Sequence, residues 1–242
     1  MMCIRTLTLV VAGLFCFTAS TAHAHFLWLL ATKDAAGKQI VQAHFSEAAD
    51  DPEPELLKRL EGLQVWHRPA TGAVETLAVR QAAEAFEADI PAEKDAKSAG
   101  IIFSERNFGV TGRGDVKFLL QYYAKLYSGA PAAGQSLGTT EKLRLDIVPV
   151  IEGRTLTLHV TWEGKPVADS EVVVKGPGLK GDKLKTDAKG LVKVDLAGSG
   201  LLEIRARHIV SKSGEFEGKA YSEVRHYCTL TMPWDGMEQA KN

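Results

Sequence analysis

The feature that most limits what this chain can fold into is a strict alternation of apolar and polar side chains from residue 155. Leu156, Leu158, Val160 and Trp162 alternate with threonines and one histidine. A period of two gives one buried and one solvated face, as in a half-buried β-strand. Further apolar segments, separated by turns, lie at 171–175, 191–196, 201–210 and 221–232. This spacing predicts a small β-sandwich over residues 142–233.

The first half of the chain shows shorter apolar segments with the spacing of a β meander. Residues 129–141 have the Gly, Pro and small-residue composition of a linker. We therefore expect a mainly β fold with two β-sandwich-like (immunoglobulin- or transthyretin-like) domains at 25–128 and 142–233, and a tail at 234–242. In the first domain we expect strands at 25–30, 39–46, 63–67, 74–79, 84–90, 100–105 and 118–127, a short helix at 54–60 and a loop at 107–115.

The first 24 residues have the pattern of a cleaved signal peptide. Arg5 precedes an apolar stretch at 7–17, and Ala22-His23-Ala24 matches a small-x-small cleavage site. We expect a periplasmic or secreted protein that begins at His25. No apolar stretch is long enough to span a bilayer, so we do not expect an integral membrane protein. Without Arg5, acidic residues slightly outnumber basic ones, which gives no reason to expect a nucleic-acid partner.

An N-terminal His25 would offer two nitrogen ligands to one metal ion. Its α-amine and its imidazole Nδ1 close a chelate ring, and the amine pKa of about 8 lets a metal displace the proton at neutral pH. Cu(II) and Ni(II) favour such nitrogen ligation. The alternative is that a histidine merely happens to follow the cleavage site.

Two further histidines are predicted to face the interior of the C-terminal sandwich. His208 shares a strand face with Leu202, Ile204 and Ala206, and His226 shares one with Cys228. The two strands are consecutive, so antiparallel pairing would bring both imidazoles to one end of an inner face. A metal ion could satisfy them there; the alternative is two core histidines bonded to backbone groups.

The remaining candidates carry weaker signals. His44 lies on the polar face of its strand and could complete a site with His25, or it could be a solvated surface residue. His67 and His159 have the pattern of surface residues, and Cys228 that of a small core residue. No motif of hydrolytic or phosphoryl-transfer catalysis is present.

Two resemblances rest on short motifs. The segments Gly164–Val172, Thr186–Gly190 and Gly200–Ile204 resemble exported sandwich modules of the carboxypeptidase-regulatory and transthyretin-like kind. Nearly the whole mature chain is similar to an exported family related to the periplasmic component of nickel and cobalt uptake systems (NikM-like). The residues that carry this second resemblance are Ala24–Leu29, Asn107–Val110, Tyr122–Lys125, His208 and Arg225–Tyr227.

The NikM-like resemblance implies metal binding, and it implies an uptake-system or envelope protein as partner. Three hypotheses follow. The first is a Cu or Ni carrier, buffer or uptake accessory that uses His25 with one or more of His208, His226 and His44. The second is an envelope-associated interaction module without metal. The third is a copper oxidase or monooxygenase of the histidine-brace kind.

Overall fold

The computed structural model of this chain describes residues 25–92, 100–128 and 142–235. The predicted signal peptide at 1–24, the predicted linker at 129–141 and most of the tail lie outside these residues. The described chain is mainly β and contains several multi-stranded sheets, so the predicted fold class is confirmed. No helix in the described ranges is long and apolar enough to cross a membrane.

The strands form three layers, and the middle layer is an eight-stranded sheet. This central sheet has the order β13-β12-β15-β18-β8-β7-β3-β4. Its strands are β3 (Gln64–Arg68), β4 (Glu75–Leu77), β7 (Ile101–Arg113), β8 (Val116–Tyr127), β12 (Glu171–Gly176), β13 (Leu179–Lys185), β15 (Gly200–Val210) and β18 (Glu223–Trp234).

The N-terminal sheet covers one face of the central sheet and the C-terminal sheet covers the other. The N-terminal sheet has the order β1-β2-β6-β5, and the C-terminal sheet is built around β10. The N-terminal strands are β1 (Phe26–Lys33), β2 (Gln39–Ser46), β5 (Arg80–Gln81) and β6 (Phe86–Asp89), with the short 3-10 helix η1 (Pro54–Leu60) following β2. The C-terminal strands are β9 (Leu145–Glu152), β10 (Thr155–Trp162), β11 (Lys165–Pro166) and β14 (Leu191–Asp195).

Alternation along β18 shows how one strand serves two cores. Cys228, Leu230 and Met232 are buried in the core shared with the C-terminal sheet. Thr229 and Thr231 point the other way, and their hydroxyls donate hydrogen bonds to the backbone carbonyls of β1. Because side chains alternate with a period of two, the central sheet can bury both of its faces.

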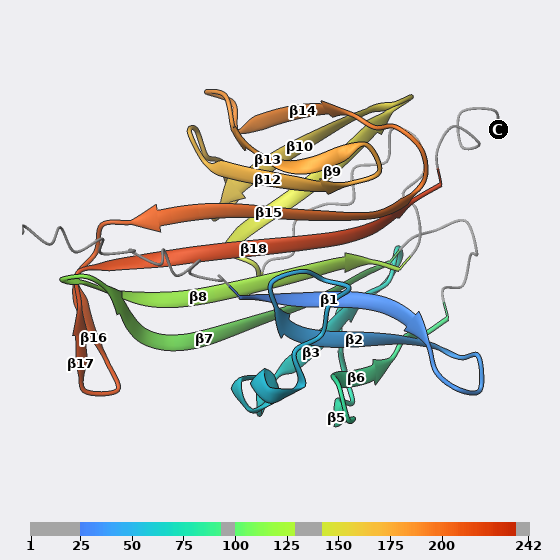
Figure 1. Ribbon diagram of the computed structural model, residues 1–242, viewed down its shortest axis with the longest axis horizontal. Helices are drawn as coiled ribbons and strands as arrows, with labels where there is room; N and C mark the ends of the chain where they lie inside the picture. The colour runs from blue at the N-terminus through green and yellow to red at the C-terminus, as the bar shows by residue number, and fades with distance from the viewer. Residues whose placement is uncertain (1–24, 93–99, 129–141, 236–242) are drawn as a thin grey trace, which may run out of the picture.

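Strands from both sides of the predicted linker meet in the central sheet. The last of the described strands, β18, lies between β15 and β8, antiparallel to β15 and parallel to β8 (Figure 1). The two halves of the chain therefore share one hydrogen-bonded sheet. The position of the predicted boundary is not tested, because residues 129–141 lie outside the described residues.

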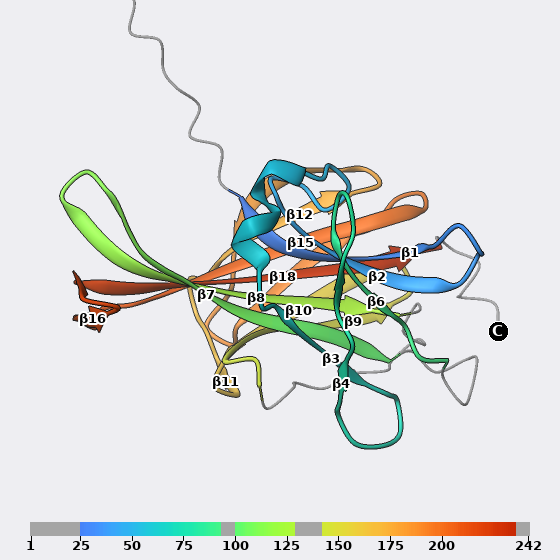
Figure 2. The same cartoon turned by 90° about the horizontal axis from the view of Figure 1, so that it is seen from below.

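Several local predictions are confirmed, and one is wrong. The strand at 39–46 and the short helix at 54–60 have the predicted bounds. The segment 107–115, predicted as a loop, belongs mostly to β7, which pairs with β8 as far as Arg113. The register shifts between Asn107 and Gly109, where a positive φ of 84° at Gly109 accommodates an irregularity in the ladder. The resulting long β7–β8 hairpin extends to one side of the layers (Figure 2).

Six strands were not predicted from the sequence: β5, β9, β11, β13, and the small hairpin of β16 (Gly214–Phe216) and β17 (Lys219–Tyr221). The β16–β17 hairpin interrupts the connection between β15 and β18. It contacts β8 and β7, and so forms one wall of the groove described below.

Candidate functional site

His25 is held at three points where the chain enters β1. Its Nε2 lies 2.9 Å from Oε2 of Glu53, and its backbone carbonyl accepts a hydrogen bond of 3.2 Å from the Tyr122 hydroxyl. Its ring lies 5.9 Å from the ring of Phe45, measured between centroids. These contacts come from three separate elements, so the position of His25 depends on the tertiary fold.

The bond to Glu53 decides which nitrogen of His25 can bind a metal. A carboxylate accepts the proton of Nε2–H and fixes that tautomer, which leaves the Nδ1 lone pair available. Nδ1 is the nitrogen that closes a chelate ring with the α-amine of an N-terminal histidine. Glu53 therefore stands in the position of the carboxylates that orient metal-bound histidines elsewhere.

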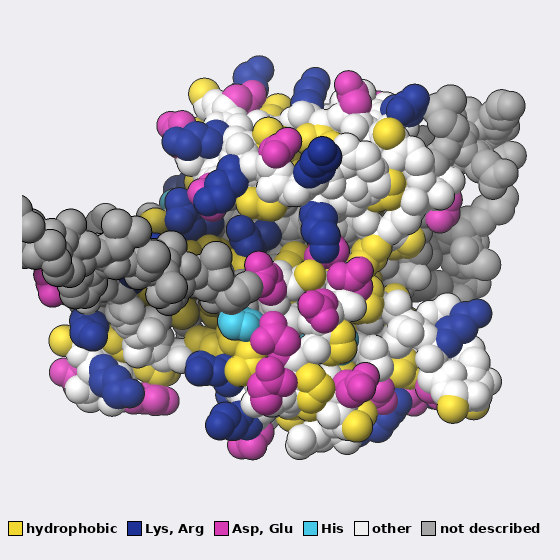
Figure 3. Space-filling model, viewed as in Figure 1, with side chains coloured by type: hydrophobic (Ala, Val, Ile, Leu, Met, Phe, Trp, Pro, Cys, Tyr) yellow, Lys and Arg dark blue, Asp and Glu magenta, His cyan; other side chains and the backbone are white. Residues whose placement is uncertain are grey.

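The surroundings of His25 are acidic. Glu53 belongs to the segment 47–55, in which Glu47, Asp50 and Asp51 are exposed. Oε1 of Glu53 also accepts the backbone N–H of Glu47, which ties the segment together. The face seen in Figure 3 shows acidic side chains gathered beside a histidine. Such a surface favours the approach of a cation.

His208 and His226 form a second cluster on the opposite face of the central sheet. They are direct partners in the antiparallel pair of β15 and β18, and their ring centroids are 6.4 Å apart. The prediction that strand pairing would bring them together is confirmed. Trp162, at the end of β10, covers the pair, with its ring 4.2 Å from His226 and 4.9 Å from His208.

Both imidazoles of this pair are neutral at neutral pH. Burial lowers the pKa of His226, and the charges of Arg144 and His208 lower it further, to about 3. Burial also lowers the pKa of His208, which is only half-buried. Neutral imidazoles have the lone pair that a metal ion requires.

An open groove of about 450 Å³ lies next to the His208–His226 pair. Its floor is the uncovered part of β7 and β8, and its walls are Arg144 before β9 and the β16–β17 hairpin. The side chains that line it are mostly polar, and they include Gln64, Glu105, Gln121, Tyr123, Arg144 and Glu217. Burial raises the pKa of Glu105, although the charges of Lys142 and Arg144 oppose this.

The solvated-surface alternative for His44 is wrong, because His44 is only 3% exposed. Burial lowers the pKa of His44, partly offset by a hydrogen bond to the Glu84 backbone. Its Nδ1 is buried without a hydrogen-bond partner among the described residues.

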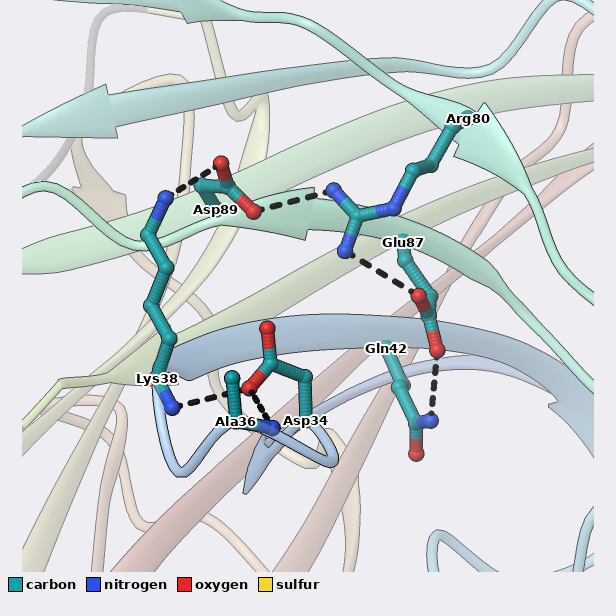
Figure 4. A network of polar contacts seen from close by, with 7 residues as sticks. All are labelled: Asp34, Ala36, Lys38, Gln42, Arg80, Glu87 and Asp89. Atoms are coloured by element: carbon teal, nitrogen blue, oxygen red, sulfur yellow. Dashed lines mark hydrogen bonds and ion pairs between the residues drawn. The ribbon is translucent and has the colours of Figure 1, made fainter.

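The same outer face of the N-terminal sheet carries a network of polar contacts (Figure 4). Gln42 donates a hydrogen bond to Glu87, and Arg80 bridges Glu87 and Asp89. Lys38 closes the network with an ion pair to Asp89. These groups satisfy one another, so the network is a structural feature of this sheet and supplies no metal site.

The other two histidines differ from each other. The prediction of a surface position for His67 is wrong: it is 2% exposed and its Nδ1 lies 2.8 Å from a Glu75 carboxylate oxygen. His159 is partly exposed on β10, between Val148 and Leu191 of the neighbouring strands. Neither lies in the two clusters described above.

The four predicted ligands do not form one site. His25 contacts Phe45, whose ring lies in the core between the N-terminal and central sheets. His208 and His226 project from the other face of the central sheet. His44 and Phe45 are consecutive residues of β2, so their side chains project from opposite faces of that strand. In the ranges that the structure describes, no group of three or more His, Cys, Asp or Glu side chains could hold a metal ion.

Sequence reasoning missed two residues that shape these clusters. Glu53 was one of several acidic residues in a segment with the composition of a solvated turn, and nothing local linked it to His25. Trp162 was assigned to the core pattern of its strand, although its position at the strand end is what places it over the histidines.

Comparison with known proteins found no matching family model and no matching curated protein.

Proposed function

We propose that this chain is an exported protein that binds Cu(II) or Ni(II) through His25 once cleavage after Ala24 has freed the α-amine. The observation that carries the proposal is the 2.9 Å contact between Nε2 of His25 and Glu53. It reserves Nδ1 for the metal, and Nδ1 and the α-amine together supply the two nitrogens of a chelate.

The role that fits this geometry is metal handling. Two protein nitrogens leave positions around Cu(II) or Ni(II) open to water or to ligands from a partner, because these ions favour at least four ligands. A site with open positions can receive and release its ion by ligand exchange. A carrier, a buffer or an accessory of an uptake system needs this property, and its partner would be an envelope protein that supplies the remaining ligands.

The oxidase hypothesis has less support. A histidine brace needs a second histidine next to the N-terminal one, and the histidines that the structure describes face elsewhere. The metal-free interaction module remains the alternative that failure of metal binding would favour.

The proposal is tested by calorimetric titration of Cu(II) and Ni(II) into protein whose mass confirms that it begins at His25. We expect one-to-one binding, and we expect one extra residue before His25 to abolish it because the amine is then an amide. Replacement of Glu53 by Ala should weaken affinity by about 10- to 100-fold, as for other residues that orient a metal-bound histidine.

Glu55→Ala is the matched control, since Glu55 is an exposed carboxylate of the same segment. It removes the same charge without touching His25, so its affinity should stay close to that of the parent protein. Equal affinity for the parent and the extended protein would refute the proposal. Equal losses in Glu53→Ala and Glu55→Ala would reduce the role of Glu53 to a general electrostatic one.

A further inference from the structure

We infer that His208, His226 and Trp162 form a second metal site, separate from His25, that binds a soft monovalent cation, Cu(I), which Ag(I) mimics. The inference does not depend on the His25 site, because the two clusters lie on opposite faces of the central sheet. It rests on the spacing of the two imidazoles, the hydrogen bonds behind His226 and the ring that covers both.

The spacing selects the coordination geometry. A metal–nitrogen bond of about 2 Å puts the ion about 3 Å from each ring centroid. Two imidazoles on opposite sides of one ion then have centroids roughly 6 Å apart, whereas square-planar or tetrahedral neighbours would be roughly 4 to 5 Å apart. The observed 6.4 Å matches the linear arrangement. Two trans ligands of a square-planar Cu(II) or Ni(II) site would have the same spacing, but such a site needs further ligands, and the described residues place no third His, Cys, Asp or Glu side chain at this pair. Two imidazoles alone match the linear two-coordination that is typical of Cu(I) and Ag(I).

A chain of hydrogen bonds fixes the tautomer of His226. Gln121 donates through Nε2 to Asn107, at 2.6 Å, and its Oε1 faces the Tyr123 hydroxyl at 3.5 Å. Tyr123 can therefore donate to Gln121 and accept from Nδ1 of His226, which is 3.3 Å away. A phenol hydroxyl is protonated at neutral pH and can both donate and accept. Nδ1–H of His226 then points to Tyr123 and the Nε2 lone pair remains for an ion.

The environment favours a single positive charge over two. Trp162 places its ring against both imidazoles, and an indole face attracts a cation that has lost its water. His226 is 1% exposed, so a divalent ion would find little room for the water ligands it prefers. The guanidinium of Arg144, 4.5 Å from the Trp162 ring, adds positive charge that penalises a divalent ion more.

The test uses mature protein with one extra residue before His25, so that the chelate of the His25 α-amine and Nδ1 cannot form. Ag(I), and then Cu(I) under anaerobic conditions with a competing chelator, are titrated while tryptophan fluorescence is followed. We expect one equivalent to bind and to quench the fluorescence. Replacement of Trp162 by Phe should remove most of this quenching while circular dichroism remains unchanged.

His208→Ala is the informative ligand variant, because His208 is half-buried at a strand end and its loss should not unfold the protein. We expect the His208→Ala variant to lose the saturable binding of Ag(I) and Cu(I). His159→Ala, a partly exposed histidine outside the cluster, should keep it. Cys228→Ala should also keep it, since the thiol is fully buried and donates to the Thr229 carbonyl.

Three results would overturn the inference: no saturable binding of either ion, binding that survives His208→Ala, or binding that disappears in Cys228→Ala. Because the extended protein lacks the His25 chelate, none of these results bears on the function proposed for His25.

Discussion

The buried ion pair of Lys125 and Asp146 joins the central sheet to the C-terminal sheet, and breaking it should be costly. Lys125 lies on β8 and Asp146 on β9, and the two side chains are 0% and 1% exposed. Burial lowers the pKa of Lys125, but the charge of Asp146 and the neighbouring Tyr127 outweigh it and raise the pKa to about 12. The lysine is therefore charged, and its counter-charge is essential in this dry position.

Replacement of Lys125 by Met should destabilise the protein by about 3–5 kcal/mol, because it leaves a buried carboxylate without its counter-charge. Asp146 would retain only the Ile147 N–H, since its second oxygen has no partner among the described residues. Asp146→Ala should cost a similar amount. The double variant should be less destabilised than either single variant, because no unpaired charge remains.

Urea denaturation of the parent protein, the two single variants and the double variant measures the free energy of unfolding of each. Calorimetry gives the corresponding shift in Tm, which should be about 2–4 °C per kcal/mol for a chain of this size. The reasoning would be refuted if either single variant lost less than about 1 kcal/mol, the value of an exposed ion pair. It would also be refuted if the two single losses simply added in the double variant.

Two further predictions follow from buried groups. The free energy of unfolding should fall by up to about 1.4 kcal/mol per pH unit as pH drops below 6.5, because unfolded His226 takes up a proton there and folded His226, with a pKa of about 3, does not. His226→Phe should flatten this slope in urea denaturation series, and an unchanged slope would contradict the assignment. Thr229→Val should cost about 1 kcal/mol by removing the 2.6 Å bond to the Leu27 carbonyl that docks β1 on β18. Thr155→Val, which removes only an exposed bond to Asp195, is the control, and an equal loss in both would be evidence against this docking role.

The sequence was informative wherever the structure depends on neighbours along the chain. The pairing of His208 with His226 followed from period-two faces and a short connection between consecutive strands, and the structure has them directly opposite. Residues 107–113 were misassigned because Gly and Asn indicate a loop, whereas in the structure Gly109 accommodates an irregularity within a long strand.

The rest of the site depends on contacts between distant segments. His44 is buried, and its ring is hydrogen-bonded to the backbone of Glu84, forty residues later in the sequence. Glu53 reaches His25 across 28 residues of sequence, and Tyr122 reaches it across 97. Strand periodicity contains no information on such contacts. The cleavage pattern before His25 made this residue a candidate ligand, but nothing in the sequence indicated that Glu53 and Tyr122 contact it.

The place of β18 between β8 and β15 has a consequence for how the chain must be assembled. Of the described strands, β18 is the last to leave the ribosome, yet it fills the middle of the central sheet. Until residue 234 has emerged, β8 and β15 each present an unpaired strand edge, and such edges invite pairing with other chains. Its parallel partner β8 lies about a hundred residues earlier, which predicts slow closure of the sheet. A nascent chain therefore needs protection from aggregation, and truncation before β18 should leave neither half able to complete its fold.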